Sequence, residues 1–385
     1  MLVLLGHYLP VEGRSMAHYR HLVASGLQQR GYRVQCLTAP VLLGRLAGPG
    51  SAAAKWLGYG DQLLIFPLLL FWRQRLWPPG TRVLVLDQAL GPWVPWIRHR
   101  PHLIICHDLL ALRASRGEFA EQAVGLSGRL YQRWIHWGFR RGRHFAAVSA
   151  ASAADLAREL PAAHPPITVL PNPLPEGYGP IQPEAARELL ESLAPGLRRT
   201  PFLLHVGGYW YKNRQEVCEV FRVLRQHHPQ LRLVLVGHLE VPTQAVLQAD
   251  PHLRQAVVSL AGVEPAQLQA LYSTAEALLF PSWWEGFGWP VLEALACGCP
   301  VITTDRDPMR EVGGAAALYV PPCPGEATAR RDWIAATATT VQTVLQRSPR
   351  ERALWRQRAL EQAARFGVSA WLDQLERSLA ATVPL

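Results

Sequence analysis

PSWWEGFGWPVLEALACGCPVITT, residues 281–304, carries the most informative pattern of the chain. An apolar run ends at Phe280 just before it, glycines follow at 286 and 288, and Pro290 begins a helical pattern. A strand, a glycine-rich turn and a helix in this order present unpaired backbone N–H groups at the carboxyl end of the strand. Because the helix dipole favours negative charge at the same place, the segment predicts a site for an anionic ligand such as a sugar diphosphate.

Two glutamates belong to this segment. Glu285 lies on the expected turn, and Glu293 lies about one helical turn inside the expected helix. Their carboxylates can accept hydrogen bonds from sugar hydroxyls and from a ribose diol. A spacing of eight residues is common by chance, so the alternative is that both are ordinary solvated glutamates.

Short apolar runs and helical patterns alternate on both sides of the segment. Such alternation predicts an α/β fold in which helices cover both faces of parallel sheets. The expected strands include Val34–Leu37, Leu103–Cys106, Phe202–Val206 and Ala277–Phe280, and the expected helices include residues 127–142, 213–227 and 265–274.

The proline-rich stretch PNPLPEGYGP, which starts at residue 171, separates two such series. A chain of 385 residues can build two ordinary cores, since single domains usually hold about 100–200 residues. The predicted parts are an N-terminal Rossmann-like domain over 1–170, a linker over 171–200, a C-terminal Rossmann-like domain over 201–365 and a last helix over 366–385. We expect that helix to pack near the first domain.

The segment EGFGWPVLEALACGCPVI resembles the signature of glycosyltransferase family 4, a large group of retaining GT-B enzymes. HVGGYWYKNR (205–214), ITVLPNPLP (167–175) and LAGVEPAQLQALYSTAEALLFPS (260–282) resemble further family segments in family order. The resemblance implies the GT-B fold, with two Rossmann-like domains facing across a cleft. It also implies transfer of a hexose, mannose first, from a nucleotide sugar to a glycan or lipid-linked acceptor, as in cell-surface polysaccharide synthesis.

The same resemblance implies roles for individual residues. Lys212 would contact the donor phosphates, Glu285 the transferred sugar, and Glu293 the ribose. In the first domain, which would bind the acceptor, His107 would contact the donor sugar and Gly13 would lie beneath the diphosphate. His107, Lys212 and Glu285 are therefore the expected catalytic residues. The other expected donor-binding positions are Gly207, Gly208, Asn213, Val263, Gly286, Phe287 and Gly288.

One position departs from the family pattern. The family commonly has an arginine directly after the first turn glycine, where this chain has Gly208. Arg214 either substitutes for that phosphate-binding cation or lies on the other face of its helix.

Basic residues are concentrated in the first domain. Residues 1–170 contain 19 lysines and arginines against 8 aspartates and glutamates. The whole chain has only two lysines, Lys55 and Lys212. This asymmetry predicts an anionic partner, such as a lipid-linked phosphate, an acidic glycan or a membrane surface; a solvated basic surface is the alternative. No nucleic-acid-binding motif accompanies the charge, so a nucleic-acid partner is not expected.

The apolar run LLIFPLLLFW, residues 63–72, is too short to span a bilayer. A buried helix is the preferred interpretation, and an interfacial helix in contact with a membrane is the alternative. Scattered cysteines without a secretory signal predict a cytoplasmic protein, peripheral to the inner face of the membrane if this helix binds lipid.

The sequence Asp305-Arg306-Asp307 spells a D-x-D, a pattern that binds a metal in other glycosyltransferases. We interpret it as incidental, because Lys212 and a helix N-terminus already offer a means of stabilising a diphosphate. We therefore expect no metal and no cofactor, and a GDP-linked or UDP-linked donor. The alternatives are a noncatalytic sugar-nucleotide- or glycan-binding GT-B protein, a nucleotide-sugar epimerase, or a phosphorylase, which would need a cofactor-binding lysine.

Overall fold

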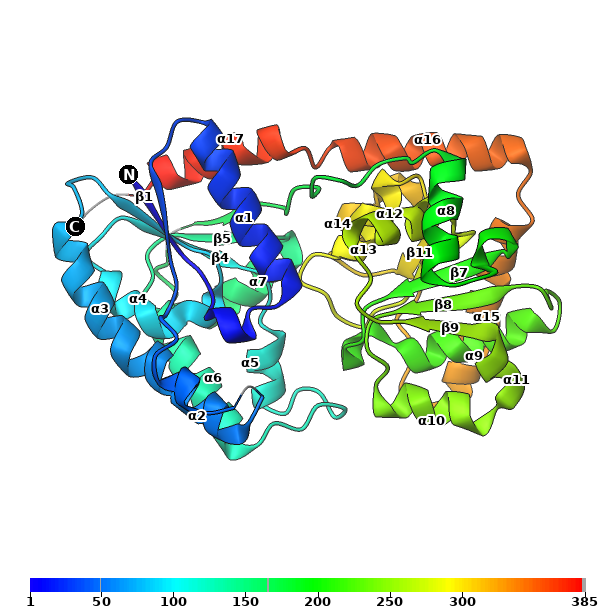
Figure 1. Cartoon of the computed structure of the whole chain (residues 1–385), viewed down its shortest axis with the longest axis horizontal. Coiled ribbons are helices and arrows are strands. Elements are labelled where there is room, and N and C mark those ends of the chain that lie inside the picture. The colour runs from blue at the N-terminus through cyan, green and yellow to red at the C-terminus, as the bar shows by residue number, and fades with distance from the viewer. Residues whose placement is uncertain (49, 165, 383–385) are drawn as a thin grey trace. The chain divides into compact units, whose positions relative to one another are not determined.

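The computed structural model describes residues 1–48, 50–164 and 166–382 (Figure 1). The chain forms two compact units. The first contains Met1–Asn172 and Val368–Leu385, and the second contains Pro173–Gly367. The predicted α/β class with two parallel sheets is confirmed, since each unit is built on one six-stranded parallel sheet.

The sheet of the first unit has the strand order β2-β1-β3-β4-β5-β6. Its central strands consist almost entirely of apolar residues because helices cover both faces. The strands are β1 (Leu2–Leu5), β2 (Val34–Leu37), β3 (Arg82–Val85), β4 (His102–Cys106), β5 (Phe145–Ala147) and β6 (Ile167–Val169).

Eight α-helices lie among the residues described for the first unit. They are α1 (Arg14–Gln29), α2 (Ala52–Gly60), α3 (Phe66–Arg73), α4 (Val94–Ile97), α5 (Leu110–Ser115), α6 (Leu126–Phe139), α7 (Ala150–Glu159) and α17 (Val368–Ala380). Helix α17 packs closely on α1, since a Cβ at Gly26 would come within 2.9 Å of the end of the Leu372 side chain, which would then have to shift. Arg30, directly after α1, bonds Asp373 and Glu376 of α17.

The sheet of the second unit has the order β12-β11-β10-β7-β8-β9. Its strands are β7 (Phe202–Val206), β8 (Arg232–Val236), β9 (Val257–Leu260), β10 (Ala277–Phe280), β11 (Val301–Thr304) and β12 (Ala317–Val320). Its helices are α8 (Pro183–Leu193), α9 (Arg214–Arg225), α10 (Val241–Ala249), α11 (Pro251–Ala256), α12 (Pro265–Thr274), α13 (Trp289–Ala296), α14 (Met309–Gly313), α15 (Ala327–Leu345) and α16 (Pro349–Ala364). Helix α8, within the stretch expected as linker, packs against α12 of this unit.

The preferred interpretation of residues 63–72 as a buried helix is wrong. A π-helical segment, Asp61–Ile65, joins α2 to α3 in one continuous helical run. Phe66 and Leu70 are buried against the core, but the opposite side of the run is exposed. We call this side the apolar stripe; its members and their exposed fractions are Trp56 (61%), Leu64 (66%), Leu68 (56%), Trp72 (64%) and, just beyond α3, Leu76 (84%). A helix at the surface buries only one face, so apolar residues on the other face remain in contact with solvent.

Within the described ranges, no helix combines the length and the apolar character needed to cross a membrane.

Candidate functional site

The expected donor residues follow two adjacent strands of the second unit. Strands β7 and β10 are neighbours, although β8 and β9 come between them in the chain. The order of the strands reverses at this point, and open parallel sheets bind ligands beside the carboxyl ends of such strands. Lys212 follows β7, and Glu285 follows β10.

Lys212 and Glu285 form a nearly buried ion pair. The Lys212 Nζ lies 2.7 Å from the Glu285 Oε1, and the two side chains are 9% and 8% exposed. The ammonium also lies 4.6 Å from the centre of the Phe280 ring. Both expected catalytic residues of this unit therefore meet at one place, where each neutralises the charge of the other. An incoming diphosphate would have to share or take over the Lys212 ammonium.

The glycine turn after β7 leaves no room for a longer side chain at its second position. Gly207 has a φ of +100°, a conformation that residues with a Cβ rarely adopt. A Cβ at Gly208 would lie 2.3 Å from the carbonyl oxygen of His238. The arginine that the family carries here is therefore sterically excluded by the backbone that follows β8.

Arg214 supports this turn from within. It is 2% exposed, and its guanidinium donates hydrogen bonds to the carbonyl oxygens of His238 and Val236, both at 2.8 Å, and to that of Gly207. The guanidinium is thus committed to carbonyl groups of this turn and of the end of β8, with the Glu240 carboxylate 3.6 Å away. The structure does not support Arg214 as a substitute phosphate-binding cation.

Asn213 connects the two loops of the site. It has the only positive φ, +59°, among the described residues other than glycine, and it caps α9. Its side-chain amide donates to the carbonyl of Pro281, 3.3 Å away, directly after β10. The turn that carries Lys212 is therefore tied to the loop that carries Glu285.

Glu293 lies on α13, which begins after Gly288 at a φ of +97°. The hydroxyl of Tyr272 donates to the Glu293 Oε2 at 2.9 Å. Burial raises the pKa of Glu293 to about 7, against the opposing effects of Tyr272 and Lys212. Near neutral pH this carboxyl group can therefore either accept or donate a hydrogen bond.

The remaining expected positions of the second unit contribute mainly backbone. Phe287 is 4% exposed and packs on Phe366 with ring centres 5.8 Å apart, so its side chain belongs to the core. Gly286 precedes it in the loop. Val263 is buried after Gly262, whose φ is +70°.

His107 follows β4 in the first unit and is held rigidly. Its Nε2 donates to the carbonyl of Leu86 at 3.0 Å, and its backbone N–H donates to the side chain of Gln88 at 2.9 Å. Burial lowers the pKa of His107, although the charge of Asp87 opposes the shift. The imidazole is therefore neutral at physiological pH, with its proton on Nε2.

Gly13 caps α1 with an ordinary φ of −68°. A Cβ there would meet nothing within 4 Å. The surrounding protein thus imposes no requirement for glycine at this position. This open space at the start of a 16-residue helix is compatible with the expected role beneath a diphosphate.

Several polar residues near these sites were not expected from the sequence. Tyr272 beside Glu293 is one, and the pair formed by His7 and Asp87 is another, with 3.0 Å between the His7 Nε2 and the Asp87 Oδ2. Asp87 lies where the apolar run Val83–Leu86 ends, so its position at the carboxyl end of a strand was the available signal.

The D-x-D sequence follows β11 and borders the loop that carries Glu285, because Arg306 donates to the carbonyl of Trp283 at 2.9 Å. Asp305 bonds Arg310. Residues 1–48, 50–164 and 166–382 contain no group of three side chains arranged to hold a metal ion.

Comparisons with known proteins agree with this arrangement. Residues 197–338 match the family described as glycosyl transferases group 1. O-antigen chain mannosyltransferase B of Escherichia coli is 35% identical over 117 residues, which cover 29% of this chain and 30% of that protein. O-antigen chain mannosyltransferase RfbU of Salmonella typhimurium is 45% identical over 73 residues, 19% of this chain and 21% of that protein. The chain thus spans less than a third of the length of these two relatives.

Solved structures resemble the whole chain. The structure of sucrose-phosphate synthase from Thermosynechococcus elongatus matches this chain with a TM-score of 0.72 at 20% sequence identity. The structure of Anabaena HepE in complex with UDP and glucose matches it with a TM-score of 0.67 at 17% sequence identity. Each match covers 99% of both chains. These likenesses confirm the predicted GT-B class.

Proposed function

Because residues 197–338 match the family described as glycosyl transferases group 1, we propose that the protein transfers a hexose from a nucleotide sugar to a glycan or lipid-linked acceptor. The observation that carries the proposal is the ion pair of Lys212 and Glu285 at the strand reversal of the second unit. A nearly buried cation next to a glycine turn is suited to a diphosphate.

In the proposed mechanism the donor exchanges partners with this ion pair. The diphosphate takes the Lys212 ammonium, and the Glu285 carboxylate accepts hydrogen bonds from hydroxyls of the transferred sugar. Negative charge grows on the diphosphate as the glycosidic bond breaks, so the ammonium and the N-terminus of α13 stabilise the transition state more than the ground state. Because the Lys212 ammonium already supplies positive charge at the diphosphate, we expect the donor to bind without a metal ion. Neutral His107 is the proposed sugar contact of the first unit, and transfer retains the anomeric configuration.

Mannose is the first sugar to test because two relatives are named mannosyltransferases. GDP-linked donors come first for that reason, and UDP-linked donors come next because HepE binds UDP. The ribose of either nucleotide would be held by Glu293.

We place the acceptor on the basic first unit and propose that this unit contacts the cytoplasmic face of an anionic membrane. The apolar stripe supplies side chains that can enter the interface, and Arg73 and Arg75 lie in sequence between its last two members, Trp72 and Leu76. Activity on an anionic acceptor should then fall with increasing salt more steeply than donor binding does.

The test is a thermal-shift panel of GDP, UDP, ADP and TDP with wild type and Lys212→Ala. A nucleotide at 100 times its dissociation constant stabilises a protein by about 2.7 kcal/mol. We expect one base to stabilise wild type and not the variant. A nucleotide that stabilises both equally would refute the role of Lys212. An assay of donor consumption distinguishes the alternatives. Consumption of the donor without any acceptor would favour an epimerase, and nucleotide binding without donor consumption would favour a noncatalytic protein.

A further inference from the structure

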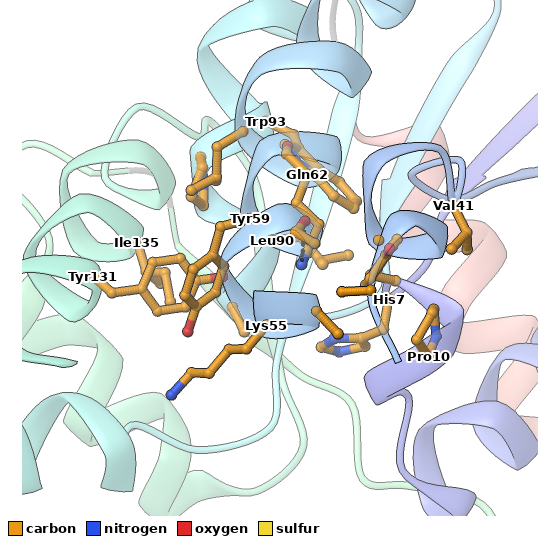
Figure 2. Close-up of a pocket in the computed structure, with 18 of the residues that line it drawn as sticks. His7, Pro10, Val41, Lys55, Tyr59, Gln62, Leu90, Trp93, Tyr131 and Ile135 are labelled. Atoms are coloured by element: carbon orange, nitrogen blue, oxygen red, sulfur yellow. Dashed lines mark hydrogen bonds between the residues drawn. The ribbon is translucent and has the colours of Figure 1, made fainter. Parts of the chain in front are cut away.

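The first unit contains a pocket of about 840 Å³ beside β1 and β3 (Figure 2). These strands are neighbours, and the strand order of this sheet reverses there as it does between β7 and β10. His7 follows β1 and borders the pocket, as does Leu90 beyond β3. The pocket therefore occupies the ligand-binding position of an open parallel sheet, yet it includes none of the expected donor residues.

Aromatic side chains form one wall of the pocket. The rings of Tyr59 and Tyr131 lie 5.1 Å apart, and Trp93 is fixed by a hydrogen bond of 2.7 Å from its Nε1 to the carbonyl of Gln62. Figure 2 shows Tyr59 and Tyr131 side by side. Such a wall can pack against the apolar face of a sugar ring or against a prenyl chain.

The charged residues that line the pocket are cations. Lys55 and Arg45 are exposed lining residues, and neither forms an ion pair with a residue that the structure describes. Figure 2 shows Lys55 extending away from its helix.

Two carboxylates that are bonded to lining residues of the pocket, Asp61 and Asp87, already have their partners. Asp61 accepts hydrogen bonds from Tyr8 and from the backbone N–H groups of residues 42–44. Asp87 is bonded to His7. The positive charge of Lys55 and Arg45 is thus not balanced within the pocket.

We propose that this pocket is the acceptor site, and that the acceptor carries a phosphate group at Lys55 and Arg45 with a sugar ring or prenyl chain against the aromatic wall. The inference rests on the proposed function, because a transferase needs a second substrate site besides that of its donor. It makes the two lysines of the chain counterparts: Lys212 binds the phosphates of the donor, and Lys55 binds the phosphate of the acceptor.

The experiment is calorimetric titration of the full chain with two probes, glucose 1-phosphate and farnesyl phosphate in vesicles, with glucose as the uncharged control. Lys55→Ala should weaken binding of the preferred phosphate probe about tenfold, as expected for loss of one charge-assisted contact. Arg33→Ala is the matched control, because Arg33 is an exposed cation of the same unit at the opposite, amino-terminal edge of the sheet. Tighter binding of glucose 1-phosphate would indicate a soluble acceptor, and tighter binding of farnesyl phosphate a lipid-linked one.

A nucleotide titration in parallel separates the two proposals. Lys212→Ala should lose nucleotide binding and keep phosphate-probe binding, whereas Lys55→Ala should do the reverse. If wild type binds nucleotide but neither phosphate probe, or if Lys55→Ala and Arg33→Ala bind them equally well, the acceptor assignment is overturned and the transferase proposal stands. If no nucleotide binds while the probes respond to Lys55, the proposed function fails instead.

Discussion

Replacing one member of the ion pair of Lys212 and Glu285 should destabilise the protein far more than replacing both members together. Both side chains are less than a tenth exposed, with 2.7 Å between Nζ and Oε1. Loss of one member leaves the other as an uncompensated buried charge, which costs about 3–5 kcal/mol. Lys212→Met and Glu285→Gln should therefore each lower the free energy of unfolding by about 3 kcal/mol. The double variant contains neither charge and should recover most of that loss.

Urea denaturation of the four proteins, followed by tryptophan fluorescence, gives the coupling energy of the pair. For a unit of about 200 residues, each kcal/mol corresponds to about 2–4 °C, so the single variants should melt about 6–12 °C lower. Single variants that lose less than about 1 kcal/mol, as for an exposed surface pair, would refute the argument.

The same four proteins separate stability from binding. The double variant should be nearly as stable as wild type and still bind nucleoside diphosphate about thirtyfold more weakly, because it lacks the ammonium. A double variant that binds nucleotide normally would show that Lys212 acts only on the fold.

Three further predictions concern other parts of the molecule. The pKa of Glu293 is about 7 in the folded protein and near 4.5 in the unfolded chain, so the folded state binds more protons between these two pH values. The free energy of unfolding should therefore fall by up to about 3 kcal/mol as the pH rises from 4.5 to above 7. Glu293→Gln should flatten this pH profile, and an unchanged slope would exclude Glu293 as its source. Gly208→Arg should weaken nucleotide binding and lower the free energy of unfolding by about 1–3 kcal/mol, because the new side chain would collide with the backbone of His238. Gly13→Ala, where a Cβ meets nothing, should leave the melting temperature unchanged. Tighter nucleotide binding by Gly208→Arg would contradict the steric argument. Trp72→Glu should reduce sedimentation of the protein with anionic vesicles at least tenfold without loss of stability. Leu354→Glu, a change at an exposed leucine of the second unit, is the control and should leave sedimentation unchanged. Equal sedimentation of the two variants would count against the apolar stripe as a membrane contact.

Much of the fold was predictable because its strands are short and almost wholly apolar. The runs Val34–Leu37 and Ala277–Phe280 form strands at the predicted residues. The interpretation of residues 63–72 failed for a physical reason. Ten apolar residues in a row fit a fully buried helix and a helix with one exposed face equally well, and only the packing of Phe66 and Leu70 distinguishes them.

The candidate site was predictable residue by residue, but its geometry was not. Lys212 and Glu285 were each singled out by family resemblance, whereas their ion pair depends on the pairing of β7 with β10 across 73 residues of sequence. The order of strands in a sheet is set by how helices pack on both faces, and no local pattern encodes it. For the same reason the pairing of His7 with Asp87, which depends on β1 lying next to β3, was not anticipated.

The assignment of α17 to the first unit bears on how the chain folds during synthesis. The second unit is one continuous stretch, so it can fold as soon as residues 173–367 have left the ribosome. The first unit begins earlier but lacks α17 until translation has passed residue 380, and until then the face of α1 around Gly26 remains uncovered. The domain that starts first is therefore completed last, and a nascent chain stalled before α17 would expose apolar surface to chaperones.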